Sequence, residues 1–69
     1  MRDLIRKRLV EEMKASGKTV KEISKALGIK HTNISQYKTK DKLPTLENFA
    51  KLCKFIDADA NYILGITEN

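Results

Sequence analysis

The sequence predicts an all-α fold, a compact arrangement of five short helices in one domain over residues 1–69. Two observations carry this prediction. Apolar residues recur at spacings of three and four along the chain, which is the period of an amphipathic helix, and no segment alternates apolar and polar residues as a strand does. Capping residues and glycines also divide the chain into short segments, so each connection between helices is only a few residues long.

The first two helices are predicted over about Asp3–Ala15 and Val20–Leu27. The apolar residues of the first lie four apart on one face, with two more beside them: Ile5, Leu9 and Met13, then Leu4 and Val10. The second helix has a signal at each end. Thr19 and Glu22 have the spacing of a capping box, and Gly28 suits a left-handed C-terminal cap.

The third helix holds Ile34 and Tyr37 and begins only a few residues after Gly28. So short a connection prevents the second and third helices from lying antiparallel side by side, and they must therefore cross steeply. This is the helix-turn-helix arrangement, which is predicted over about residues 19–38.

The fourth helix is predicted to start after Thr45, a good N-cap residue, and to end at about Ile56. Its buried face is predicted to comprise Leu46, Phe49, Ala50, Cys53 and Ile56. A fifth helix, Ala60–Leu64, would be capped by Asp59 and closed by Gly65.

Charge is unevenly distributed along the chain. Residues 1–42 contain 12 lysines and arginines and five acidic residues, a charge of +7, whereas residues 43–69 contain two basic and four acidic residues, a charge of −2. A basic half joined to a mildly acidic half is common in proteins that bind nucleic acid. Charge alone leaves open the simpler interpretation that the lysines belong to solvated helix faces.

The outward face of the third helix is polar and basic. With about 100° per residue and Ile34 facing the core, Thr32, Gln36 and Thr39 point away from it. The residues that flank them are short polar side chains and lysines: Asn33, Ser35, Lys30, Lys38, Lys40 and Lys42. Amides and hydroxyls hydrogen-bond to base edges in the major groove, and lysines pair with phosphates. This pattern favours double-stranded DNA as the partner, with an ordinary solvated helix face as the alternative.

Several classes of protein and site are excluded or unsupported. A single cysteine, Cys53, excludes an internal disulfide and a cysteine zinc cluster, and its spacing favours a small core residue over a redox switch. No signal peptide or membrane-spanning segment is recognisable, so a cytoplasmic location is expected. No constellation of carboxylates with the one histidine suits catalysis, and no cofactor, metal or small-molecule effector is expected.

From Gly17 to Gly65 the chain resembles the lambda-repressor-like helix-turn-helix family, the Cro and repressor class of phage and bacterial regulators. The residues that carry the resemblance stand in the family's order and spacing: Thr19, Glu22, Ile23, Leu27-Gly28-Ile29, Ile34-Ser35, Tyr37, Pro44, Leu46-Glu47, Lys51-Leu52, Lys54, Ile56 and Ile63-Leu64-Gly65. The resemblance implies a compact five-helix DNA-binding domain in which helices 2 and 3 form the DNA-binding unit. It also implies a homodimer that binds a partly palindromic operator.

By this resemblance, four residues of the third helix take base-reading positions: His31, Thr32, Asn33 and Gln36. The residues expected at the DNA backbone are Thr19, Lys21, Lys30, Ser35, Lys38, Thr39, Lys40 and Lys42. The chain departs from the family at three positions. Val20 replaces a glutamine that contacts phosphate, a role open to Lys18 or Lys21, and Lys40 replaces a glycine of the following loop. Lys30 replaces a small hydroxyl cap, which predicts that the third helix starts late or frays at its first turn.

Apolar residues near the C-terminus form a predicted dimer interface on the less basic half: Phe55, Tyr62, Ile63 and Ile66. The alternative is that they complete a thin core. The chain is thus predicted to be a sequence-specific transcriptional regulator, a Cro-like phage or bacterial repressor. The alternatives are a protein-interaction module, for example an antitoxin-like partner of another protein, and non-specific binding of nucleic acid. Apolar anchors on the outward helix would indicate the former, and stacking aromatics the latter.

Overall fold

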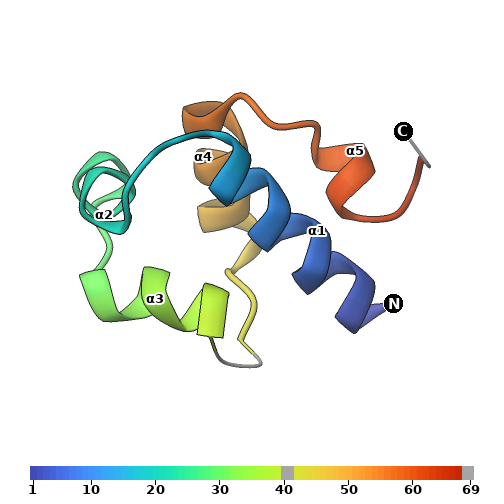
Figure 1. Cartoon of the computed structure of the whole chain (residues 1–69), viewed down its shortest axis with the longest axis horizontal. Helices are drawn as coiled ribbons and strands as arrows, with labels where there is room; N and C mark the ends of the chain where they lie inside the picture. The colour runs from blue at the N-terminus through green and yellow to red at the C-terminus, as the bar shows by residue number, and fades with distance from the viewer. Residues whose placement is uncertain (40–41, 68–69) are drawn as a thin grey trace.

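The computed structural model describes residues 1–39 and 42–67. Within them the chain forms five α-helices and no strand, in the order α1 Arg2–Ala15, α2 Val20–Leu27, α3 His31–Thr39, α4 Leu46–Ile56 and α5 Ala60–Ile63 (Figure 1). The all-α prediction is confirmed. The observed ends differ from the predicted ones by a single residue, at Arg2 and at Ile63.

The connection between α2 and α3 is a closed turn. Gly28 adopts a left-handed conformation (φ 70°), which a residue with a Cβ rarely takes, and its N–H donates to the Ser24 carbonyl oxygen at 2.9 Å. Ile29 N–H donates to the same oxygen at 3.2 Å, and the Ser24 hydroxyl donates back to the Ile29 carbonyl. In Figure 1, α2 is seen nearly end-on while α3 lies across the view, so the two helices cross steeply, as predicted.

The capping box at the start of α2 is present as predicted. The Thr19 hydroxyl accepts the Glu22 backbone N–H at 3.1 Å, and the Glu22 carboxylate accepts the Thr19 backbone N–H at 2.9 Å. These bonds satisfy two N–H groups that have no partner within the helix. The bond from the Thr19 backbone N–H favours the charged carboxylate and, with a weaker contribution from the Thr19 side chain, holds the pKa of Glu22 below its usual range.

We expect Glu22→Gln to destabilise the protein at neutral pH and to do so less in acid. Because folding lowers the pKa of Glu22, the charged carboxylate stabilises the folded state above the unfolded pKa of about 4.3, and this contribution is lost as the pH falls through the lowered value. Urea unfolding at neutral pH and at a pH well below that value would measure the difference. Glu11→Gln, which alters an exposed glutamate of α1, is the control. If Glu22→Gln lowered the free energy of unfolding by the same amount at both pH values, the stabilising role of the charged Glu22 carboxylate would be contradicted.

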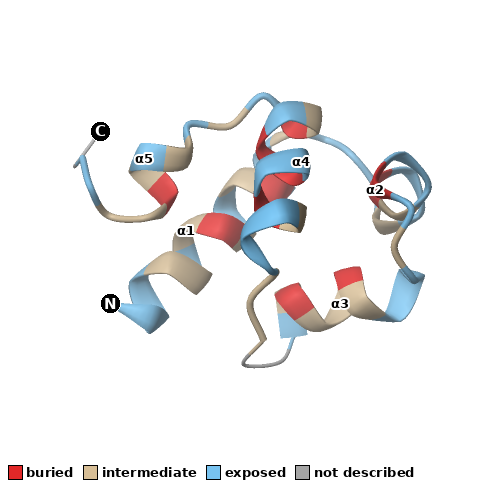
Figure 2. Ribbon diagram, turned by 180° about the vertical axis from the view of Figure 1, so that it is seen from behind, coloured by how far each residue is buried: buried red, intermediate tan, exposed pale blue. Residues whose placement is uncertain are grey.

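The buried stripe of α4 differs from the predicted one. Leu46 is 83% exposed and Ala50 is also exposed, whereas Leu52, outside the predicted stripe, is fully buried. The observed stripe is Phe49, Leu52, Cys53 and Ile56 (Figure 2). These positions are three and four apart and begin one turn into the helix, because the first turn of α4 projects beyond the core. The prediction was therefore wrong at Leu46 and Ala50.

One core joins all five helices. Its buried members are Leu9, Met13, Ile23, Leu27, Ile34, Tyr37, Phe49, Leu52, Cys53, Ile56 and Ile63. Helix α1 packs against α5 and α3, and α2 packs against α3 and α4. Burial raises the pKa of the Cys53 thiol, with Asp59 and Glu12 acting in the same direction, so this thiol is a core group as predicted.

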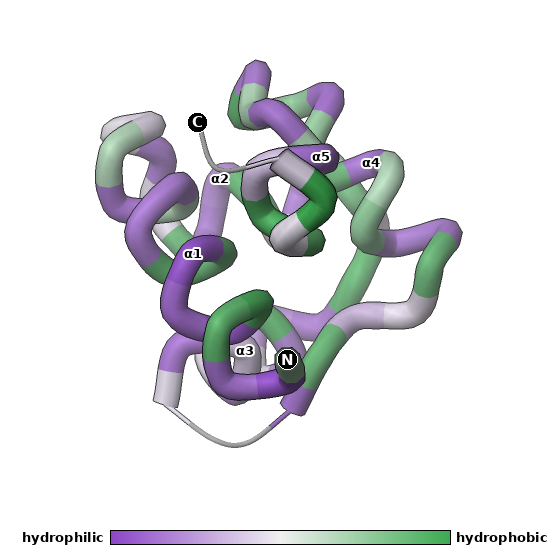
Figure 3. The backbone as a smooth tube through the Cα atoms, turned by 90° about the vertical axis from the view of Figure 1, so that its right-hand side faces the viewer, coloured by the Kyte–Doolittle hydropathy of each residue, from purple (hydrophilic) through white to green (hydrophobic). Residues whose placement is uncertain are grey.

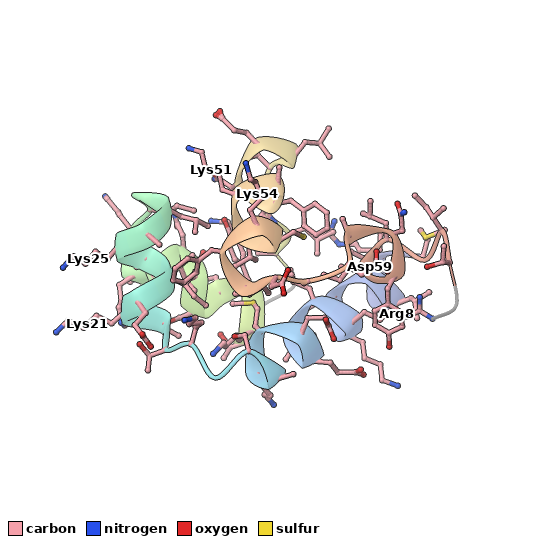
Figure 4. The ribbon with its side chains drawn as sticks, turned by 90° about the horizontal axis from the view of Figure 1, so that it is seen from above. Arg8, Lys21, Lys25, Lys51, Lys54 and Asp59 are labelled. Carbon is pink, nitrogen blue, oxygen red and sulfur yellow. The ribbon has the colours of Figure 1, made fainter. Side chains whose placement is uncertain are left out.

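Arg8 ties the C-terminal segment to α1. Its guanidinium Nη1 donates to the Tyr62 carbonyl oxygen at 2.6 Å and to the Thr67 carbonyl oxygen at 3.1 Å. The same guanidinium lies 4.3 Å from the centre of the Tyr62 ring, in cation–π geometry (Figure 4). The end of the described chain is thereby held beside α1, away from α2 (Figure 1).

Candidate nucleic-acid interface

Helix α3 has one buried side and one accessible side. Ile34 and Tyr37 are buried in the core, as predicted, and hold the helix against α1 and α2. The predicted base-reading residues are accessible, with His31 and Thr32 exposed and Asn33 and Gln36 half-buried. No acidic residue lies in the first turn of α3. The accessible side therefore offers hydroxyl, amide and imidazole groups without a carboxylate among them.

Helix α3 begins at His31, immediately after Lys30, and so it does not start late. The Lys30 carbonyl oxygen accepts the N–H of Asn33 at 3.0 Å and of Ile34 at 3.4 Å. The late start predicted from the missing hydroxyl cap was wrong, because the closed turn from Gly28 to Ile29 already directs the chain into the helix. His31 and Thr32 consequently belong to its first turn.

Lys42 joins two of the predicted base-reading residues. Its ammonium Nζ donates to the Gln36 amide oxygen Oε1 at 3.0 Å and to the Asn33 amide oxygen Oδ1 at 3.3 Å. Lys42 was predicted only as a contact to the DNA backbone. Asn33 and Gln36 are three residues apart and so share a side of the helix, but the sequence does not indicate that Lys42 contacts them.

The lysines around α3 come from α2, from α3 itself and from the segments that precede these two helices. Lys30 is exposed just before α3, and Lys38 is half-buried near its end. Lys21 and Lys25 project from α2 at the edge of the molecule (Figure 4). Lys18 lies with its ammonium 5.4 Å from the Phe55 ring centre. The predicted backbone contact of Lys40 lies outside the described residues.

Three hydroxyls were also predicted at the DNA backbone. The Thr39 hydroxyl donates its proton to the Ser35 carbonyl oxygen at 3.0 Å, so in this rotamer it has no proton for a phosphate oxygen. The Thr19 hydroxyl accepts the Glu22 N–H in the capping box, and the Thr19 side chain also hydrogen-bonds to the Glu22 carboxylate, so its proton is directed at that carboxylate. The neighbouring Glu22 carboxylate is a negative charge at this position. Ser35 is half-buried on the flank of α3.

The predicted dimer residues separate into two groups. Ile63 is fully buried, so its side chain belongs to the core and is not available to a partner; the prediction is corrected there. Phe55 and Tyr62 are half-buried, each with a cation over its ring. Ile66 is 69% exposed.

The exposed Ile66 directly follows Gly65, which lies against the start of α1. Leu4 and Met1 both lie beside Gly65, and both are exposed. We call Met1, Leu4 and Ile66 the terminal apolar patch. In Figure 3 the N-terminus and α5, the two segments that meet at Gly65, both lie toward the reader.

Residues 1–39 and 42–67 contain no group of three or more histidine, cysteine, aspartate or glutamate side chains that could hold a metal ion. None of the described helices has both the length and the apolar character that a bilayer span requires.

Comparison with known families agrees with this geometry. A helix-turn-helix family model matches residues 9–63, from the core of α1 to the end of α5. The chain belongs to the Cro/C1-type helix-turn-helix family. This confirms the resemblance found in the sequence, and membership in the Cro/C1-type family supports a DNA-binding transcriptional regulator.

The chain is similar to the cryptic phage CTXphi transcriptional repressor RstR of Vibrio cholerae serotype O1 (strain El Tor Inaba N16961). The two chains are 30% identical over 61 residues, which is 88% of this chain and 54% of the relative. The chain thus spans about half the length of the curated relative it matches. No solved structure matches it.

Proposed function

We propose that this protein is a sequence-specific double-stranded DNA-binding repressor of transcription that acts as a homodimer on a palindromic operator. The observation that carries the proposal is the accessible side of α3, where Thr32, Asn33 and Gln36 present hydroxyl and amide groups free of acidic neighbours in the first turn. Such groups hydrogen-bond to base edges in the major groove, which is wide enough to admit one helix. The family membership and the repressor relative support the same conclusion.

In this function the lysines supply affinity and α3 supplies discrimination. Lys21, Lys30 and Lys38 flank the helix at positions where the phosphate backbones of a bound groove would run. Each neutralised phosphate releases condensed counterions, so binding weakens steeply as salt rises. The bound protein would repress transcription by blocking the access of RNA polymerase to the DNA.

The proposed dimer forms through the terminal apolar patch. Its exposed side chains, Met1, Leu4 and Ile66, have no polar group to hydrate, and burying them against a second copy removes apolar surface from water. The patch lies at α1 and α5, on elements other than the helix-turn-helix unit, so a partner docked there leaves α3 accessible. Two recognition helices would then meet successive major grooves about 34 Å apart.

Selection from a random duplex library, followed by sequencing, tests the proposal. The expected result is an enriched inverted repeat with half-sites about one helical turn apart, and binding whose logarithm falls linearly with the logarithm of salt concentration. Ile66→Asp is the matched variant for the dimer, and it should leave enrichment of single half-sites only. Absence of any enriched sequence at moderate salt would refute specific binding and would favour the protein-interaction module instead.

A further inference from the structure

The side chain of Lys42 lies between the two amides of the accessible side of α3. Its ammonium nitrogen is 3.0 Å from Gln36 Oε1 and 3.3 Å from Asn33 Oδ1. All three side chains are half-buried, so the contacts are partly shielded from water. Lys42 thus acts on the residues that the proposed function uses for base reading.

The chemistry of the ammonium group decides how both amides are oriented. An ammonium has three N–H donors and no lone pair, so only the oxygen of an amide can bond to it. The oxygen and nitrogen of a glutamine or asparagine are otherwise hard to distinguish, but here the lysine permits one orientation. With Oε1 and Oδ1 directed at Lys42, the NH₂ groups of Gln36 and Asn33 are the parts turned away from it.

This orientation bears on which base each amide can read. Glutamine or asparagine reads adenine by a bidentate pair, in which the amide oxygen accepts from N6 and the amide nitrogen donates to N7. Lys42 occupies one of the two lone pairs of each amide oxygen and turns that oxygen toward itself, so the bond from adenine N6 is restricted to the remaining lone pair. The NH₂ group remains able to donate to acceptors in the major groove, namely guanine O6 and N7 or thymine O4.

We propose that Lys42 is a positioning residue that sets the base preference of Asn33 and Gln36, turning them from adenine toward acceptor edges of guanine or thymine. The inference rests on the proposed function and refines it. Two of the three ammonium protons are used by the amides, and the third remains for a phosphate or a base. A lysine that only touched phosphate would add affinity for every sequence equally.

The test compares base preferences in the random-library selection for four proteins: the wild type, Lys42→Met, Lys30→Met and Gln36→Ala. Methionine keeps the apolar stem and removes the charge in both variants. We expect Lys42→Met to raise the preference for adenine over guanine or thymine by at least about fivefold at the base positions that Gln36→Ala also alters. Lys30→Met, which removes an exposed lysine on the same side, should weaken binding without changing the preferred bases.

A second measurement probes the contact without DNA. The side-chain NH₂ signals of Asn33 and Gln36 in an NMR spectrum should shift in Lys42→Met and stay in place in Lys30→Met. Unchanged amide signals in Lys42→Met would overturn the inference. The inference would also be overturned if Lys42→Met selected the same DNA motif as the wild type and only bound it more weakly. A wild type that selects no motif would refute the proposed function itself, and the inference with it.

Discussion

Ile34→Ala is expected to lower the free energy of unfolding by about 2–5 kcal/mol, the usual cost of removing a large buried aliphatic side chain. Ile34 is fully buried and is one of two core residues of α3, the other being Tyr37. A chain of this length has a stability of roughly 3–10 kcal/mol in total. The substitution therefore removes a large share of it and should populate unfolded protein at physiological temperature.

Urea unfolding followed by circular dichroism measures this loss. Leu46→Ala is the matched control, because the leucine at that position is 83% exposed and its removal should change the stability by no more than about 0.5 kcal/mol. If both variants lost the same small amount, α3 would not be anchored to the core through Ile34, and the described packing of the helix-turn-helix unit would be refuted.

Gln36→Ala is expected to weaken binding to the selected operator by about 1–3 kcal/mol and to relax the preference at one base position in each half-site. The amide lies on the accessible side of α3, held by Lys42, so its loss removes a base contact together with a hydrogen bond within the protein. Binding to random duplex should change little, since phosphate contacts dominate there.

Fluorescence anisotropy with operator and random duplexes, over a range of salt concentrations, separates these effects. Lys30→Ala provides the contrast: it should weaken both duplexes alike and reduce the slope of log affinity against log salt by about one. Equal losses on operator and random DNA for Gln36→Ala would remove this residue from the base-reading set.

The helix boundaries could be read from the sequence because their signals are local. Thr19 and Glu22 form the capping box that their spacing predicts, and Gly28 takes the left-handed conformation that glycine adopts without steric cost. The division of α3 into a buried and an accessible side also followed from the helical period, once Ile34 was taken to face the core.

Features that depend on packing between helices were harder to predict. The period of α4 admits several stripes, and only the position of α4 on the core decides that Leu52 is buried and Leu46 is exposed. Ile63 continues the apolar C-terminal sequence, yet the course of α5 turns it inward while Ile66 stays outside. The contact of Lys42 with the amides depends on the loop after α3, which carries no periodic signal.

The closed turn between α2 and α3 has a consequence for the thermodynamics of recognition. Three hydrogen bonds between residues 24 and 28–29 fix the direction in which α3 leaves α2 before any DNA is present. The conformational entropy of orienting α3 is therefore lost when the protein folds, and DNA binding does not have to lose it again. Association can then proceed as the docking of a preorganised surface. We therefore expect different DNA sequences to differ mainly in the dissociation rate of the complex and less in the association rate.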